Sequence, residues 1–119
     1  MAQSVRWSPI PGGITAPDGF QAAGIRAGLK ASGRRDLSLL LAPENAVCAG
    51  TFTTSVVRAA CVDLCAARLQ EGAPRVRAVV TNSGQANACT GDRGLIDSLR
   101  ATQAVADRLG LMADQGLIC

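Results

Sequence analysis

A stretch of eleven small or polar residues, 81–91, separates two segments of opposite character. The apolar run 76–80 precedes it and predicts a buried strand, and a helical pattern that begins near Gly94 follows it. The stretch holds no large hydrophobic side chain and no fixed charge. Gly84 and Gly91 permit backbone angles that other residues avoid, and Asn, Ser and Thr bond to nearby backbone in tight turns. The sequence therefore predicts a strand, a polar loop and a helix in succession.

Two interpretations of this polar loop are open at the level of composition. Small polar residues between a strand and a helix N-terminus can form a ligand cradle, because free N–H groups and the helix dipole favour an anion or a developing oxyanion. An ordinary strand-to-helix connection has the same composition, since binding residues concentrate on loops without occupying every one of them.

The composition narrows the class of protein. At 119 residues, of which 48% are hydrophobic, the chain is one domain or part of a larger one and can bury a core. Aromatic residues make up only 3%, so we expect an aliphatic core and no single-stranded nucleic-acid partner, which would need stacking platforms. The net charge of +3 is scattered, and no apolar run reaches transmembrane length, so neither a nucleic acid nor a membrane is an expected partner.

Cysteine and histidine usage limits the chemistry further. Histidine is absent and no two cysteines are spaced as CxxC, so the usual zinc sites and Ser-His or Cys-His pairs have no residues to form them. We predict no metal and no cofactor, because the glycine-rich stretches also lack the phosphate-binding spacings. Reduced thiols that act as small hydrophobes fit a cytoplasmic protein. Cys89, in the polar loop, is either such a packed residue or a thiol whose pKa the helix N-terminus lowers.

Three further strands are expected before the apolar run 76–80. The segment 19–30 alternates loosely and is interrupted at Gly24 and Gly28, where a bulge or a close backbone approach is expected. The segments 36–42 and 46–53 are the next two strands, joined by a short turn after Pro43. Together they predict neighbouring strands of one sheet. The buried positions expected in the first segment are Phe20, Ala22, Ile25 and Leu29.

Two helices complete the prediction. Apolar spacing predicts a helix over 55–70, with a short strand followed by a shorter helix as the alternative, and residues 72–74 end the pattern. The second helix extends from near Gly94 to residue 109, with Asp92 near its start and Gly110 as its C-terminal cap. Residues 116–119 read as the beginning of another strand. The residues expected to line one face of the second helix are Leu95, Leu99, Thr102, Ala106 and Leu109.

Residues 82–91, Asn-Ser-Gly-Gln-Ala-Asn-Ala-Cys-Thr-Gly, closely resemble a signature of the glutamate N-acetyltransferase (ornithine acetyltransferase) family of arginine biosynthesis. The similarity covers nearly the whole chain, and on these residues the chain is identified as a member of that family. The other matching segments are 19–20, 23–25, 28–30, 35–37, 49–53 and 58–60.

The resemblance implies an enzyme that moves an acetyl group from N2-acetylornithine to glutamate, with acetyl-CoA as a second donor in some members. Such a precursor cleaves itself before a threonine, which becomes an N-terminal nucleophile with its own amine as base and needs no histidine. The implied fold is α+β, a layered mixed sheet with flanking helices. The implied partners are the two small-molecule substrates and the β segment of the same precursor, in an oligomer of αβ pairs.

The resemblance also implies which residues matter here. Residues 1–119 match the N-terminal part of the α segment, as a single partial domain, and no catalytic residue is expected among them. After residues like 117–119 the family continues with a Ser-Thr-Gly oxyanion run, so Thr90 and Gly91 are not that pair. Gln85 replaces the usual Asn, and the family's proline near Cys61 favours a strand and then a helix there. The expected active-site-supporting residues are Asn82, Ser83, Gly84, Asn87, Thr90 and Gly91.

Two other functions remain as alternatives. One is a related N-terminal-nucleophile aminopeptidase, which shares the broad architecture. The other is a non-catalytic domain that binds a small anion or pairs with a partner chain.

Overall fold

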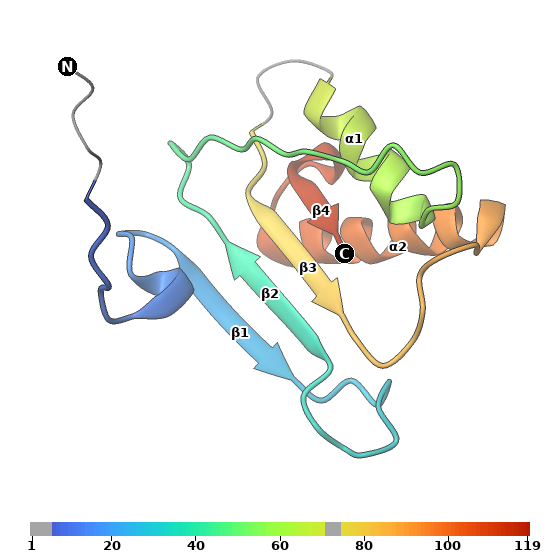
Figure 1. Ribbon diagram of the computed structural model, residues 1–119, viewed down its shortest axis with the longest axis horizontal. Coiled ribbons are helices and arrows are strands. Elements are labelled where there is room, and N and C mark those ends of the chain that lie inside the picture. Colours follow the sequence, from blue (N-terminus) through green and yellow to red (C-terminus); the bar gives the residue numbers. More distant parts are fainter. Residues whose placement is uncertain (1–5, 71–74) are drawn as a thin grey trace.

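The computed structural model describes residues 6–70 and 75–119, which form a four-stranded mixed sheet with two α-helices (Figure 1). The strands lie side by side in chain order; the first three pair antiparallel, and the last pairs parallel to its neighbour. This confirms the expected α+β class. The strands are β1 (Gln21–Ile25), β2 (Leu37–Leu41), β3 (Ala78–Asn82) and β4 (Gly116–Ile118). The helices are α1 (Ala60–Gln70) and α2 (Gly91–Leu109), with 3₁₀ turns at Gly13–Thr15 and Ala113–Gln115.

Helix α2 is the crossover between the two parallel strands. Parallel neighbours need such a connection, and it brings the residues that follow β3 and β4 to the same end of the sheet. The helix ends at Gly110, whose φ of 66° is left-handed and whose N–H bonds to the carbonyl of Ala106. The predicted C-terminal cap is thereby confirmed.

The face of α2 that meets the rest of the molecule is made of small side chains. Ser98, Thr102 and Ala106 are buried, and a methyl group added at Gly116 of β4 would lie 3.4 Å from Thr102 Cβ. The prediction placed Leu95 and Leu99 on the buried face as well, but these side chains are 38% and 43% exposed. Small residues let the helix approach the sheet closely, which leaves the leucines at the margin of the contact.

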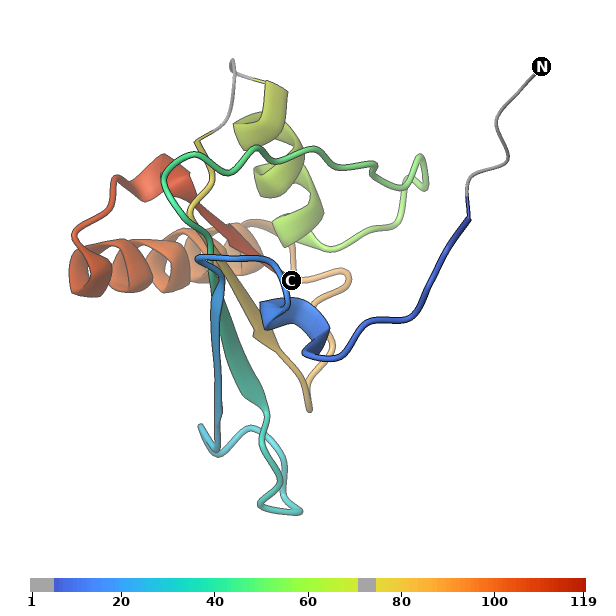
Figure 2. The same cartoon turned by 90° about the vertical axis from the view of Figure 1, so that its left-hand side faces the viewer.

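Helix α1 covers the outer edge of β4, so Figure 2 shows β4 between the two helices. The Cys65 thiol donates to the carbonyl of Ile118 at 3.3 Å, and the Arg68 guanidinium donates to the carbonyl of Gly116 at 2.5 Å. These side chains occupy carbonyls that another strand would otherwise use. The main apolar cluster joins Cys65 to Val76 and Leu117, with Cys48, Leu69 and Val79 around it.

The predicted strand over 46–53 is wrong. These residues form no strand and pass beside α1, where a methyl group on Gly50 would lie 2.9 Å from Leu69 Cδ1 (Figure 1). Both edges of β2 are already paired, with β1 and with β3, so the segment after β2 has no neighbouring edge to join. Val47, 95% exposed, lies outside the core as a result.

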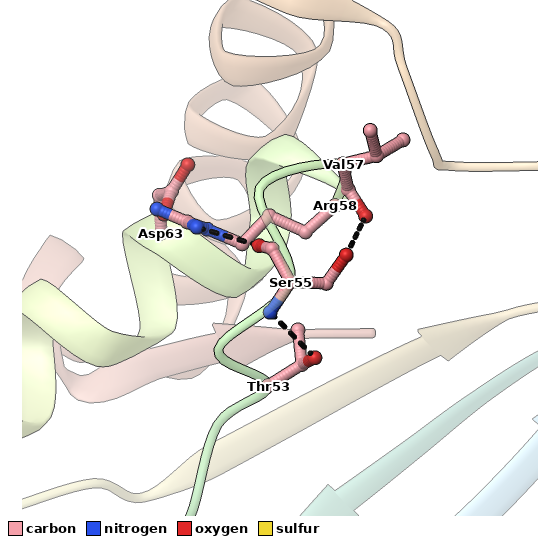
Figure 3. Close-up of polar contacts among 5 residues, drawn as sticks. All are labelled: Thr53, Ser55, Val57, Arg58 and Asp63. Atoms are coloured by element: carbon pink, nitrogen blue, oxygen red, sulfur yellow. Dashed lines mark hydrogen bonds and ion pairs between the residues drawn. The ribbon is translucent and has the colours of Figure 1, made fainter.

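The predicted helix over 55–70 is also too long, and the shorter helix of the alternative prediction is confirmed. Polar contacts before Ala60 hold a non-helical turn (Figure 3): the Ser55 N–H donates to Thr53 Oγ1 at 3.1 Å and its hydroxyl donates to the Val57 carbonyl at 2.9 Å. Arg58 bridges to the carbonyl of Ser55 and to Asp63 in the first turn of the helix. The strand part of that alternative is limited to a single bridge between Ala59 and Ala88. The predicted stop at residues 72–74 lies outside the described residues.

The first strand is shorter than predicted. The pairing of β1 with β2 is unbroken from Gln21 to Ile25, so no bulge occurs at Gly24. Ala22 is exposed and Ile25 is 55% exposed, contrary to expectation, whereas Phe20 and Leu29 are half-buried. Because β1 is the outermost strand, less of the molecule covers its side chains.

Across the described residues, neither helix is long and apolar enough to cross a lipid bilayer.

Candidate functional site

The polar loop lies between β3 and α2, as the sequence predicts, but it is shorter. Thr81 and Asn82 belong to β3 because they pair with Ser38 and Leu37 of β2. The helix starts at Gly91 instead of near Gly94. The connecting turn is therefore residues 83–90, with Asn82 and Gly91 at its two ends, and we call it the polar turn.

A reciprocal pair of amides closes the polar turn. Asn87 Nδ2 donates to Asn82 Oδ1 at 2.8 Å, and Asn82 Nδ2 donates back to Asn87 Oδ1 at 3.4 Å. The Thr90 hydroxyl donates to the carbonyl of Asn87 at 3.0 Å. The bridge between Ala88 and Ala59 adds a contact with the segment before α1. The turn is thus held by its own side chains at several points along its length.

Three residues of this region have left-handed backbone. Gly84 and Gly91 have φ of 103° and 55°, which glycine adopts without strain. Cys89 has φ of 57°, which costs a residue with a Cβ about 1 kcal/mol. Its side chain is exposed, so the interpretation of Cys89 as a packed small residue is wrong.

A cleft of about 380 Å³ opens beside the polar turn, next to the ends of β3 and β4 and the first turns of α2. Among the predicted residues, Asn82, Asn87 and Thr90 line this cleft, together with Gln85. Ser83 instead lines a separate hollow of about 280 Å³ beside β1 and β2. Gly84 and Gly91 line neither of them, so they shape the backbone only.

The rest of the cleft lining was not predicted. It includes Arg93, Asp97 and Ser98 of α2 together with Cys61 of α1. Arg93 Nε and Asp97 Oδ2 are 3.0 Å apart. Residues 90, 94 and 98 are one helical turn apart, and this spacing could have indicated that one side of α2 lines the cleft beside the polar turn. The charged residues at 93 and 97 indicated a solvent-exposed face instead.

The groups of the cleft suit hydrogen bonding better than nucleophilic catalysis. Burial raises the pKa of the Cys61 thiol, and the neighbouring Cys119 raises it further. Cys61 therefore stays protonated at neutral pH. The lining otherwise offers amides, hydroxyls and one ion pair. Within residues 6–70 and 75–119, no group of three or more His, Cys, Asp or Glu side chains could hold a metal ion.

A polar turn and a cleft lie at the carboxyl ends of adjacent parallel strands, beside the N-terminus of their crossover helix, in an α+β fold. Clefts at such strand ends are common places for small-molecule sites in proteins. The family model described as the ArgJ family matches residues 21–119. The chain belongs to the ArgJ family.

Curated relatives agree with this assignment. The arginine biosynthesis bifunctional protein ArgJ of Parasynechococcus marenigrum (strain WH8102) is 71% identical over 113 residues, which are 95% of this chain and 28% of the relative. The protein of the same name from Synechocystis sp. (strain ATCC 27184 / PCC 6803 / Kazusa) is 53% identical over 112 residues, 94% of this chain and 27% of the relative. The chain therefore spans little more than a quarter of the length of these relatives.

Two solved structures share the fold. The ornithine acetyltransferase of Mycobacterium tuberculosis, solved in complex with ornithine, superposes with a TM-score of 0.83 and 42% identity, over 89% of this chain and 57% of that one. The ArgJ protein of Bacillus halodurans gives a TM-score of 0.83 and 31% identity, over 90% of this chain and 55% of that one. These similarities confirm the family resemblance read from the polar loop.

Proposed function

We propose that this chain supplies the N-terminal part of an acyltransferase that moves an acetyl group from N2-acetylornithine to glutamate in arginine biosynthesis. The observation that carries the proposal is the ArgJ family match over residues 21–119, which includes the whole polar turn. The printed names of the relatives and the ornithine in one solved relative support it. The match to this family disfavours a related aminopeptidase and a non-catalytic anion-binding domain.

In this proposal the reacting groups come from outside residues 1–119. The nucleophile is a threonine that self-cleavage of a longer precursor frees, with its own amine as base, and the oxyanion donors also belong to the further chain. The cleft is compatible with this division, because Cys61 is a protonated thiol and the sequence contains no histidine.

The polar turn supports the active site because its own backbone is held in a fixed conformation. The reciprocal amide bonds of Asn82 and Asn87 and the hydroxyl bond of Thr90 hold the wall of the cleft. Ser83, Gly84 and Gly91 contribute through the backbone, the two glycines by left-handed φ angles. A rigid wall keeps donors and substrate in place without reorganisation during the reaction.

The remaining parts of the proposal concern partners and place. Residues 1–119 form one partial domain that assembles with the β segment of the same precursor, and αβ pairs form an oligomer. Acetyl-CoA serves as a further acetyl donor, with no bound cofactor, and the enzyme is cytoplasmic.

The test compares substrates on the full-length protein. We expect acetyl transfer from N2-acetylornithine to glutamate and no hydrolysis of peptide amides, and we expect residues 1–119 alone to show no turnover. Hydrolysis of peptide amides without acetyl transfer would favour the aminopeptidase. Turnover by residues 1–119 alone would contradict the location of the catalytic groups.

Asn87→Ala tests the role of the polar turn. Losing the amide pair should lower kcat for acetyl transfer by roughly tenfold to a hundredfold, because misplaced supporting groups act on the transition state. Asn45→Ala, in an exposed turn before residue 46, is the matched control and should leave the rate unchanged. Normal kcat in Asn87→Ala would remove the supporting role.

A further inference from the structure

Asp36 is a buried carboxylate just before β2, only 4% exposed. Its Oδ1 accepts the N–H of Ala27 at 2.6 Å and its Oδ2 accepts the N–H of Lys30 at 2.8 Å. Both donors belong to the connection between β1 and β2, residues 26–35. A single side chain therefore ties two backbone points of this connection together.

The same residue reaches the polar turn on its other side. The backbone carbonyl of Asp36 accepts the N–H of Ser83 at 2.8 Å. The next residue, Gly84, lies so close to the β1–β2 connection that an added methyl group would be 3.2 Å from the Leu29 carbonyl carbon and from the Lys30 nitrogen, and 2.6 Å from Lys30 Cγ. The clamped connection and the start of the polar turn are thus in direct contact.

We propose that Asp36 is a positioning residue for the polar turn. Its carboxylate fixes the β1–β2 connection, and that connection holds Ser83 and Gly84 in place by direct contact. The inference deepens the proposed function, since the turn matters for catalysis only if it supports the active site. Asp36 lines the smaller hollow together with Ser83 and is not part of the cleft lining, so we place its effect on the cleft in the polar turn.

Carboxylate chemistry suits this role. Two oxygens accept two N–H donors at once, whereas an amide of the same shape offers one acceptor and turns an N–H toward the second donor. Buried N–H groups left without an acceptor destabilise the structure around them. Asp36→Asn should therefore release one end of the clamp while it preserves volume.

The experiment is amide hydrogen exchange on the full-length protein, with α2 amides as the reference for global folding. In Asp36→Asn we expect exchange at residues 27–30 and at 83–84 to become at least about tenfold faster, with α2 unchanged. Asp18→Asn, an exposed aspartate in a turn, is the matched control and should change neither segment. Faster exchange at 27–30 with 83–84 unchanged would overturn the proposal, because Asp36 would then hold only its own connection.

A second variant separates the two links and does not depend on the fold tolerating Asp36→Asn. Lys30→Ala keeps the N–H that Asp36 binds and removes the methylenes beside Gly84, so exchange should rise at 83–84 and not at 27–30. Unchanged exchange at 83–84 in this variant would contradict the claim that the β1–β2 connection holds these residues in place.

Acetyl transfer gives an independent reading on the Asp36→Asn protein. A lower kcat with little change in KM would agree with a displaced turn. Faster exchange at 83–84 with normal transfer would support the positioning role of Asp36 and contradict the proposed role of the polar turn, so the two claims can fail separately.

Discussion

Gly84 and Gly91 share a left-handed backbone but have different surroundings. A methyl group on Gly84 would be 2.6 Å from Lys30 Cγ, whereas a methyl group on Gly91 would meet no atom within 4 Å. We expect Gly91→Ala to lower the free energy of unfolding by about 1 kcal/mol through backbone strain alone. Gly84→Ala should cost about 1–3 kcal/mol more, because it adds a steric clash. Chemical denaturation of both variants measures the difference, and equal losses would contradict the close approach at Gly84.

Asp36 also predicts a pH dependence of stability. Hydrogen bonds from the N–H groups of Ala27 and then Lys30 hold its pKa below the ordinary value of 3.8, and the Lys30 charge adds to them. A carboxyl with a lower pKa in the folded state stabilises the fold above the ordinary value, and this contribution is lost as the pH falls through the folded-state pKa. As the pH falls below about 4, the free energy of unfolding of the wild type should therefore decrease more than that of Asp36→Asn. Parallel pH profiles of the unfolding free energy would show that Asp36 makes no such contribution.

At the scale of elements, the contact between α2 and the sheet depends on small side chains. Ala106 is buried to 1% exposure, whereas Ala104, half a turn earlier on the same helix, faces solvent. Ala106→Leu should lower the free energy of unfolding by about 1–3 kcal/mol or more, because the added carbons have no space. Ala104→Leu changes helix propensity by the same amount as Ala106→Leu and should leave the free energy of unfolding nearly unchanged. A similar small effect at both positions would mean that α2 packs less closely than described.

The elements with strong local patterns were the predictable ones. The apolar run of β2 and the helical spacing of α2 identified both elements, and Gly110 identified the end of α2. The strand predicted over 46–53 failed because strand formation needs a free edge, and β3 occupies the edge that this segment would use. Local sequence carries β propensity and does not record which edges are taken.

The candidate site was predictable in position and only partly in content. The polar composition of residues 81–91 located the turn, and the resemblance to the family singled out Asn82, Asn87 and Thr90, which line the cleft. Arg93 and Asp97 were missed because their charges looked like an ordinary solvated helix face. Asp36 was missed because its partners, Ala27 and Lys30, are backbone groups with no signature in side-chain sequence.

At the scale of the whole molecule, large aliphatic side chains remain at the surface of the described residues. Leu95, Ile96 and Leu99 are 38%, 46% and 43% exposed and lie within two turns of α2. Neighbouring apolar groups of this kind form association surfaces. Residues 1–119 on their own should therefore self-associate or require a partner chain.

The measurement is light scattering coupled to gel filtration on residues 1–119. The double variant Leu95→Lys with Leu99→Lys should lower the average mass of the assemblies, whereas Ala104→Lys, on the same helix, should not. A wild-type sample that is a single monomeric species and melts cooperatively would count against this expectation.

The sequence by itself determined the place of the polar turn and the family, and through the family resemblance the α+β class, because these depend on local composition and a contiguous ten-residue signature. Tertiary structure alone decided that β3 extends into Thr81 and Asn82, that 46–53 stays outside the sheet, and that Asp36 joins two connections. Each of these outcomes depends on which backbone N–H and C=O groups find partners far away in the chain, and that is settled only when the strands have taken their order.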